Sequence, residues 1–307
     1  MSLNIRKGPQ KRAYRTIIYG PEGIGKSTLA SKFPDVVFID FEHGTDTMDV
    51  ARFDTPTSLD ELVHLLNSIA QEDVCKTVVL DTADRVEQII TKHVCDSKGL
   101  KSIEDAGYGK GYTYLLESWI ELLKVLDKVI ESGKNVVLVA HAQMRKFEQP
   151  DEMGAYDRWE LKLSKKTAPI IKEWSDMLLF CNYKTTVTED PKTKSKKAVG
   201  GKRVMYATHS PVYDAKNRFG LPDSMEMDFD EIAHVFADVP LKKSKKAEIY
   251  EAIEDHDGFE PWLIYFLSTQ DPTLQAKSID ELEPKVIDFV HTNIEKLINK
   301  FNSKEDN

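Results

Sequence analysis

The segment Gly20-Pro-Glu-Gly-Ile-Gly-Lys-Ser27 constrains this chain more than any other feature, because it fits G-x-x-x-x-G-K-[S/T] at every fixed position. The strand-like TIIY precedes it directly, and the helix-like STLASKF follows it from Ser27. A loop of this kind joins a buried strand to a helix, and its backbone N–H groups point inward at phosphate oxygens. The sequence therefore predicts a P-loop within an α/β domain.

The P-loop pattern assigns a role to each of its polar side chains. Lys26 is predicted to reach the β- and γ-phosphate oxygens, and the hydroxyl of Ser27 is predicted to bind Mg²⁺. No N-K-x-D motif for reading guanine is present, so ATP and Mg²⁺ are the expected ligands. The predicted nucleotide-binding residues are Gly20, Pro21, Glu22, Gly23, Ile24, Gly25, Lys26, Ser27 and Thr28.

The rest of the chain up to residue 240 alternates short apolar runs with helical stretches, a pattern typical of a mainly parallel sheet with helices on both faces. Unalternated apolar runs favour strands buried on both faces. These runs are 16–19, 36–40, 77–81, 135–140 and 177–181. Helical spacing covers 26–33, 59–70, 85–94 and 112–131. We expect a core at 1–240 and a small helical C-terminal extension at 241–307.

Composition limits the classes of partner. Asp and Glu total 51 against 42 Lys and Arg, a net charge of −9, so a generally basic nucleic-acid coat is excluded and phosphate contacts must come from local patches. The three cysteines show no C-x-x-C spacing, and no apolar run approaches 18 residues. We expect a cytoplasmic protein that does not bind membranes.

A P-loop site needs a second magnesium partner from a neighbouring buried strand. Asp81 ends the apolar run TVVL and is the candidate carboxylate, which would hold the metal directly or through water. The alternative is that Asp81 caps the helix that begins near Asp84.

The residue that activates water must lie elsewhere, because Thr82 and not Glu follows Asp81. Glu42 closes the strand-like VVFIDF. The carboxyl ends of parallel strands meet at one edge, where ligands of such sheets bind, so Glu42 is the candidate general base. The alternative is a solvated Glu in a turn.

Four motifs then appear in an order that resembles RecA-like proteins over about residues 15–222. VVFIDFEHGTD resembles the RecA strand whose Glu activates water, and NVVLVAHAQMRK resembles the strand whose terminal polar residue senses the γ-phosphate. The resemblance implies that Glu42 is the base and that His141, where RecA has Gln, is the sensor. Alternatively, His141 is an ordinary strand-end histidine.

The segment DAKNRFGLP resembles the RecA stretch in which two cations reach the ATP of a neighbouring subunit. It implies that Lys216 and Arg218 complete a composite site in trans. An exposed basic turn is the alternative. The short N-terminus and these strings look most like phage-encoded RecA-like ATPases of the single-strand annealing and recombination type. The large RecA terminal modules are missing here, and the tail after Pro240 is extra.

Two segments would bind DNA if the resemblance holds. The first spans 97–111, where glycines permit a mobile loop, and the second follows His141. Lysines and arginines would contact phosphates, and a tyrosine would stack on bases. The candidate residues are Lys98, Lys101, Tyr108, Lys110, Arg145, Lys146, Arg158 and Lys162. The second segment also contains five acidic residues, so a solvated charged loop is a rival. A third stretch, 192–203, has six cations and is predicted to be a hairpin tip.

The leading hypothesis is an ATP-dependent, DNA-stimulated protein that promotes annealing or recombination. Its expected partners are single-stranded DNA, further copies of the chain in a ring or filament, and a single-stranded-DNA-binding protein. A regulatory or motor ATPase acting on protein and a small-molecule kinase remain alternatives. A DNA-packaging motor is disfavoured because residues 241–307 lack a nuclease-like carboxylate cluster.

Overall fold

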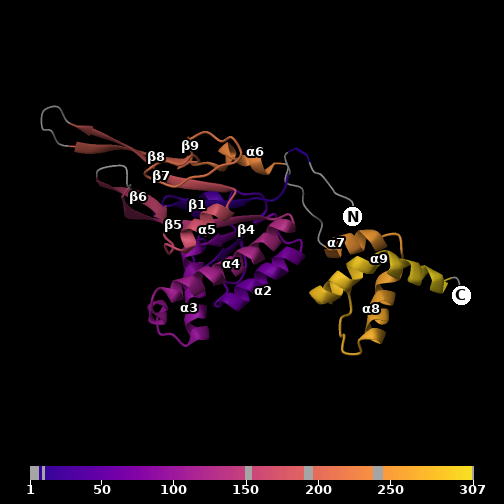
Figure 1. Ribbon diagram of the computed structural model, residues 1–307. Helices are drawn as coiled ribbons and strands as arrows, with labels where there is room; N and C mark the ends of the chain where they lie inside the picture. Colours follow the sequence, from indigo (N-terminus) through magenta and orange to yellow (C-terminus); the bar gives the residue numbers. More distant parts are fainter. Residues whose placement is uncertain (1–6, 9–10, 149–153, 190–195, 238–244, 306–307) are drawn as a thin grey trace. The chain divides into compact units, whose positions relative to one another are not determined.

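A mostly parallel β-sheet organises the first 240 residues of this computed structural model, which describes residues 7–8, 11–148, 154–189, 196–237 and 245–305 (Figure 1). The strand order is β3-β2-β4-β5-β1-β7-β8-β9, and β6 pairs with β5. The pairs from β3 to β7 are parallel, whereas β5–β6, β7–β8 and β8–β9 are antiparallel. The strands are β1 (Arg15–Gly20), β2 (Val36–Asp40), β3 (Ala51–Arg52), β4 (Thr77–Asp81), β5 (Asn135–Glu148), β6 (Ala155–Leu161), β7 (Met177–Glu189), β8 (Lys196–Tyr206) and β9 (Ser224–Glu226).

Helices cover both faces of this sheet, as the α/β pattern predicted. On one face, residues of α1 and α6 join alternate strand residues in one apolar core. Helices α2, α3 and α4 lie together on the other face (Figure 1). Both faces of a strand such as β4 are thus buried, which explains its unalternated TVVLD sequence. The helices are α1 (Lys26–Ala30), α2 (Leu59–Gln71), α3 (Ala83–Lys98), α4 (Lys110–Glu131), α5 (Thr167–Trp174) and α6 (Ala233–Phe236), with 3₁₀ turns η1 (Ile103–Ala106) and η2 (Phe229–Glu231).

The sheet topology brings four strand ends to one edge. The expectation that the Asp81 strand directly neighbours the P-loop strand is wrong, because β5 lies between β4 and β1. In the parallel registers, Gly20 pairs with His141, and Asp40 pairs with Asp81. The carboxyl ends of β1, β5, β4 and β2 therefore meet beside the P-loop.

Two antiparallel hairpins, β5–β6 and β7–β8, extend beyond the parallel part of the sheet (Figure 1). The segment after His141 is therefore mainly strand and not a loop. The predicted hairpin tip at 192–203 is also corrected, because β8 already runs from Lys196; Lys192 and Lys194 lie outside the described residues. The predicted mobile loop at 97–111 contains the end of α3, the turn η1 and the start of α4.

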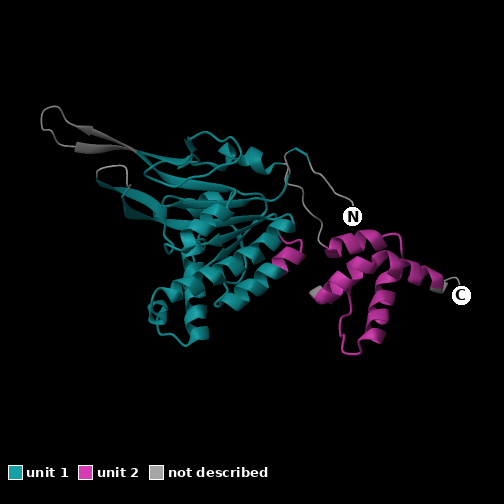
Figure 2. Ribbon diagram, in the orientation of Figure 1, with its two compact units in different colours: residues 1–67, 75–240 teal, residues 68–74, 241–307 magenta. Residues whose placement is uncertain are grey.

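The chain divides into two compact units, residues 1–67 with 75–240 and residues 68–74 with 241–307 (Figure 2). The C-terminal helices are α7 (Lys245–Ile253), α8 (Phe259–Gln270) and α9 (Pro284–Glu305), with the turn η3 (Ile279–Glu281). They surround an apolar cluster of their own, which includes Phe259, Leu263 and Val290. Within the described ranges, no helix is both long enough and apolar enough to span a bilayer.

All three cysteine side chains are buried. Cys75 is 2% exposed, Cys95 is 9% exposed and Cys181 is fully enclosed. Burial raises the pKa of the Cys181 thiol to about 12, which keeps this sulfur protonated and unreactive at neutral pH.

Candidate active site

The P-loop connects β1 to α1 in the predicted position. An ideal Cβ on Gly20 would lie 2.2 Å from the carbonyl oxygen of Cys181 on β7, so only glycine fits at this point. Gly25 has a φ of 104°, which also favours glycine. Between them, the side chain of Ile24 is fully buried in the apolar core and anchors the loop. The loop is thus held in a fixed path by packing on both sides.

Lys26 points its ammonium group back into this loop. Its Nζ donates to the carbonyl oxygens of Gly20 and Pro21, at 3.1 and 3.0 Å. The side chain is only 6% exposed, and burial lowers the pKa of Lys26. A phosphate group would supply the charge partner that the buried ammonium needs.

Ser27 and Asp81 meet at the edge of the sheet. The Ser27 hydroxyl donates to Asp81 Oδ2 at 2.5 Å. Burial raises the pKa of Asp81 to about 6. A hydroxyl and a carboxylate at this separation are hard oxygen donors of the kind that Mg²⁺ prefers, so the residues fit the metal that the motif implies.

Asp40 builds the turn that presents Glu42. Its carboxylate accepts the N–H groups of Glu42, Gly44 and Thr45 as well as the Thr45 hydroxyl. Burial alone would raise the pKa of Asp40, but these hydrogen bonds outweigh it and lower the pKa. The anion therefore fixes the backbone on which Glu42 stands.

Glu42 lies beside the Asp81 strand with its carboxylate partly exposed. Its Oε1 accepts the Arg85 Nε–H at 3.0 Å and the Thr82 hydroxyl at 3.4 Å. The backbone N–H of Phe41 donates to the carbonyl of Asp81, which locks the two strand ends together. Glu42 is therefore a held carboxylate at the nucleotide edge and not a solvated turn residue.

His141 ends the parallel part of β5, where it pairs with Gly20, and it is held by a residue to which the sequence analysis assigned no role. Asp84 in the first turn of α3 accepts the backbone N–H of His141 at 3.1 Å and contacts its Nδ1 at 2.9 Å. The Nε2 atom lies 3.9 Å from Glu42 Oε2. The only available signal was the position of Asp84, three residues after Asp81, which also suits a helix start.

Arg203 is a second residue whose place was not foreseen. An ideal Cβ on Gly25 would lie 2.8 Å from the Arg203 Nη1 atom, so β8 brings a guanidinium to the P-loop of the same chain. Its neighbour in sequence, Lys202, points to the other side of the strand and pairs with Glu226. The basic run suggested a hairpin tip and gave no indication of this contact.

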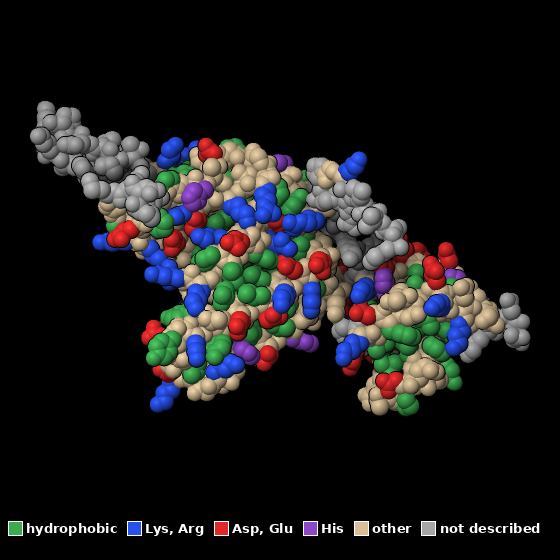
Figure 3. Space-filling view, in the orientation of Figure 1, with side chains coloured by type: hydrophobic (Ala, Val, Ile, Leu, Met, Phe, Trp, Pro, Cys, Tyr) green, Lys and Arg blue, Asp and Glu red, His purple; other side chains and the backbone are tan. Residues whose placement is uncertain are grey.

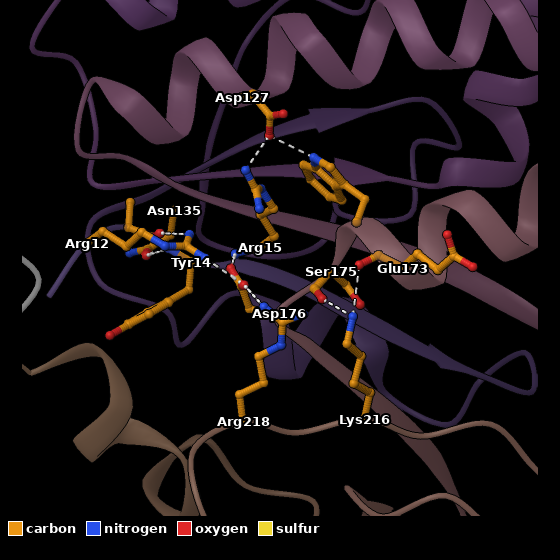
Figure 4. A network of polar contacts seen from close by, with 12 residues as sticks. Arg12, Tyr14, Arg15, Asp127, Asn135, Glu173, Ser175, Asp176, Lys216 and Arg218 are labelled. Atoms are coloured by element: carbon orange, nitrogen blue, oxygen red, sulfur yellow. Dashed lines mark hydrogen bonds and ion pairs between the residues drawn. The ribbon is translucent and has the colours of Figure 1, made fainter. Parts of the chain in front are cut away.

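Lys216 and Arg218 lie at the amino ends of β1 and β7, the edge opposite the P-loop (Figure 4). Lys216 Nζ donates to the carbonyl oxygens of Lys172, Glu173 and Ser175 at the end of α5, so it acts as a C-terminal helix cap. Arg218 is 59% exposed and makes one contact of 3.4 Å with Asp176. Neither cation can reach the nucleotide site of its own chain.

The candidate DNA-binding residues differ in availability. Arg158 is paired with buried Asp214 at 2.5 Å and is 11% exposed. Arg145 donates to the Leu163 carbonyl and pairs with Glu160. Lys98 lies over the Tyr114 ring, and Tyr108 is fully exposed. Lys101, Lys110, Lys146 and Lys162 are exposed. On the face drawn in Figure 3, basic and acidic side chains are interspersed.

Comparison with protein-family models matches residues 12–219 to the family AAA_24, described as an AAA domain. The match covers the P-loop, Asp81, Glu42, His141 and Arg218. A search of curated proteins gives no match.

Proposed function

The chain belongs to the AAA domain family of P-loop NTPases, and on this premise we propose that it hydrolyses ATP in response to single-stranded DNA and promotes annealing or recombination. One observation carries the proposal. The P-loop, Asp81, Glu42 and His141 converge at one sheet edge, and β5 continues from His141 directly into the β5–β6 hairpin. The nucleotide site and a projecting arm are thus parts of one strand.

The site supplies the groups that hydrolysis needs. Lys26 and the loop amides would bind the phosphates, and Ser27 and Asp81 would hold Mg²⁺, which would supply positive charge next to the phosphoryl oxygens. Glu42 orients the attacking water and takes its proton. His141 lies next to Glu42 at the end of β5, and it passes a change in the state of that residue and the γ-phosphate to the hairpin.

We place the regulating nucleic acid in a cleft of about 680 Å³ that Asp84 helps to line. Lys101 from the first candidate segment and Lys162 from the second both line it, together with Asp84, which holds His141. A strand backbone bound to these lysines would lie next to the sensor. Acidic residues such as Asp96 and Glu104 also line the cleft, so we expect binding to be modest and strongly salt-dependent.

The decisive experiment measures ATP turnover with and without a single-stranded oligonucleotide at low and moderate salt. We expect stimulation that declines as salt rises, and no turnover by Lys26→Ala. A rate of ATP turnover that DNA does not change at any salt concentration would favour an ATPase that acts on protein. Phosphate transfer to a small molecule would favour a kinase.

The cleft has its own test. We expect Lys101→Ala with Lys162→Ala to remove DNA stimulation while basal turnover is kept. Lys124→Ala with Lys128→Ala on α4 removes the same charge outside the cleft lining and should keep the stimulation. Equal loss in both pairs would contradict DNA binding at this cleft.

A shared site between subunits is the second part of the proposal. Arg218 is exposed at the edge opposite the P-loop, where it can serve only a neighbouring copy. We expect Arg218→Ala and Lys26→Ala to be inactive alone and to recover activity when mixed, because a mixed interface pairs an intact P-loop with an intact Arg218. Mixtures without recovery would contradict the shared site.

A further inference from the structure

Asp84 and His141 form the most closely fixed polar pair near the nucleotide edge. The two oxygens of Asp84 are divided between the backbone N–H and the Nδ1 atom of His141, at 3.1 and 2.9 Å. The side chains are 9% and 12% exposed. This bidentate contact fixes both the position of the strand end and the rotation of the imidazole ring.

The charge of Asp84 decides where the imidazole carries its proton. Burial by itself would raise the pKa of Asp84, but the hydrogen bonds from His141 outweigh it and lower the pKa. An ionised carboxylate only accepts hydrogen bonds, so Nδ1 of His141 must be the protonated nitrogen. In the neutral ring, Nε2 then has a free lone pair.

The Nε2 atom lies close to Glu42. The distance from Nε2 to Glu42 Oε2 is 3.9 Å, which a small movement of the partly exposed carboxylate can close. The other oxygen of Glu42 is occupied by Arg85 and Thr82. Asp84, His141 and Glu42 thus form a compact cluster at the nucleotide edge, in which one nitrogen or oxygen atom of each lies within 4.8 Å of the others.

We propose that Asp84 is a positioning residue that makes His141 the proton acceptor behind Glu42, an inference that rests on the proposed ATP hydrolysis. The water oxygen bonds to the γ-phosphorus, and the bond to the β–γ bridging oxygen breaks with its electron pair leaving on ADP. The water proton passes to Glu42 and then to Nε2 of His141. The imidazolium is stabilised by Asp84 until it releases the proton to solvent.

An amide at position 141 could not take this role, because it donates and accepts hydrogen bonds but does not take up a proton. The histidine, which stands where the RecA strand has Gln, therefore gives this position a group that can accept a proton. The structural evidence is the carboxylate of Asp84 behind the ring, which stabilises a positively charged imidazole.

A double-mutant cycle tests the proposal. We expect Asp84→Asn to lower kcat about tenfold or more at an unchanged KM in the wild-type background, because the ring loses its fixed tautomer. In the His141→Gln background the same change should lower kcat less than twofold. Equal losses in both backgrounds would overturn the proposal.

Glu87→Gln is the matched control. Glu87 lies one turn further along α3 and accepts hydrogen bonds from Trp119, Ser164 and Thr167. It is a partly buried carboxylate of the same helix without a contact to His141 among the described residues. We expect this change to alter the unfolding midpoint and to keep basal kcat. A kcat loss equal to that of Asp84→Asn would show a merely structural role and overturn the proposal.

A spectroscopic readout avoids any dependence on variant folding. In ¹⁵N-histidine-labelled wild-type protein, the His141 ring, assigned by its absence in His141→Gln, should show the Nδ1–H tautomer. An Nε2–H tautomer would overturn the proposal. Glu42→Gln separates a failure of the proposed hydrolysis mechanism from a failure of this inference. Retained hydrolysis in Glu42→Gln refutes Glu42 as the base. Lost hydrolysis in Glu42→Gln, together with an unchanged kcat in Asp84→Asn, refutes only the positioning role of Asp84.

Discussion

At the scale of single residues, the two cations of the AKNRF segment have different environments. Lys216 donates to three carbonyl groups at the end of α5, whereas Arg218 is mostly exposed. We expect Lys216→Ala to lower the free energy of unfolding by about 1–2 kcal/mol, because the last turn of α5 loses its cap. Arg218→Ala should change it by less than about 0.5 kcal/mol. Urea denaturation measures both, and equal stability of the two variants would contradict the cap.

Asp81 shows how a site residue can lower stability. Its pKa is about 6 in the folded chain against an ordinary value of 3.8, so the native state binds the proton more tightly than the unfolded state. Stability therefore falls as pH rises between these values, and at pH 8 the whole cost, about 3 kcal/mol at most, is present.

We therefore expect Asp81→Asn to raise the melting temperature of the protein without metal and nucleotide at pH 8, with the gain vanishing near pH 4. Thermal unfolding at both pH values measures this. Asp96→Asn, which changes an exposed carboxylate, should give no comparable gain. A gain of the same size at pH 4 would show that the proton linkage is not its cause.

At the scale of elements, the contact between β1 and β7 depends on Gly20. A Cβ there would meet the Cys181 carbonyl at 2.2 Å, so we expect Gly20→Ala to push the strands apart, to cost about 1–3 kcal/mol of stability and to weaken nucleotide binding. Gly44→Ala, where the added Cβ meets nothing within 4 Å, is the control. Chemical denaturation and a fluorescent nucleotide titration measure the effects, and equal behaviour of the two variants would refute this packing argument.

The elements also show what the sequence could predict. Apolar runs predict β1, β2, β4 and the first half of β5, because strands buried on both faces are continuously apolar. The second half of β5 and β6 were not predicted, because a projecting hairpin is exposed and its polar residues resemble a loop. The insertion of β5 between β1 and β4 depends on long-range pairing, which local patterns do not encode.

The residues of the candidate site also fall into two groups, those that sequence motifs predict and those that only the fold brings to the site. Lys26, Ser27, Asp81 and Glu42 follow from short motifs at strand ends, and the topology brings them together. Asp84 and Arg203 act through contacts across 57 and more than 170 positions of sequence. No spacing rule marks such partners, so only the folded chain shows them.

At the scale of the whole molecule, each unit has an apolar cluster of its own. We expect calorimetry to resolve two unfolding transitions. A non-hydrolysable ATP analogue with Mg²⁺ should raise the melting temperature of only the transition that belongs to the unit with the P-loop, since a ligand stabilises the state that binds it. Lys26→Ala should abolish that rise and keep both transitions. A single transition that moves as a whole would contradict independent units.

The burial of all three thiols has a practical consequence. A maleimide dye would find Cys75 and Cys181 enclosed and Cys95 only 9% exposed at the cleft lining, so a cysteine introduced at the fully exposed Tyr108 would be labelled fastest. Fluorescence reporters could then be attached at position 108, with Cys95→Ser to remove the thiol that lines the cleft.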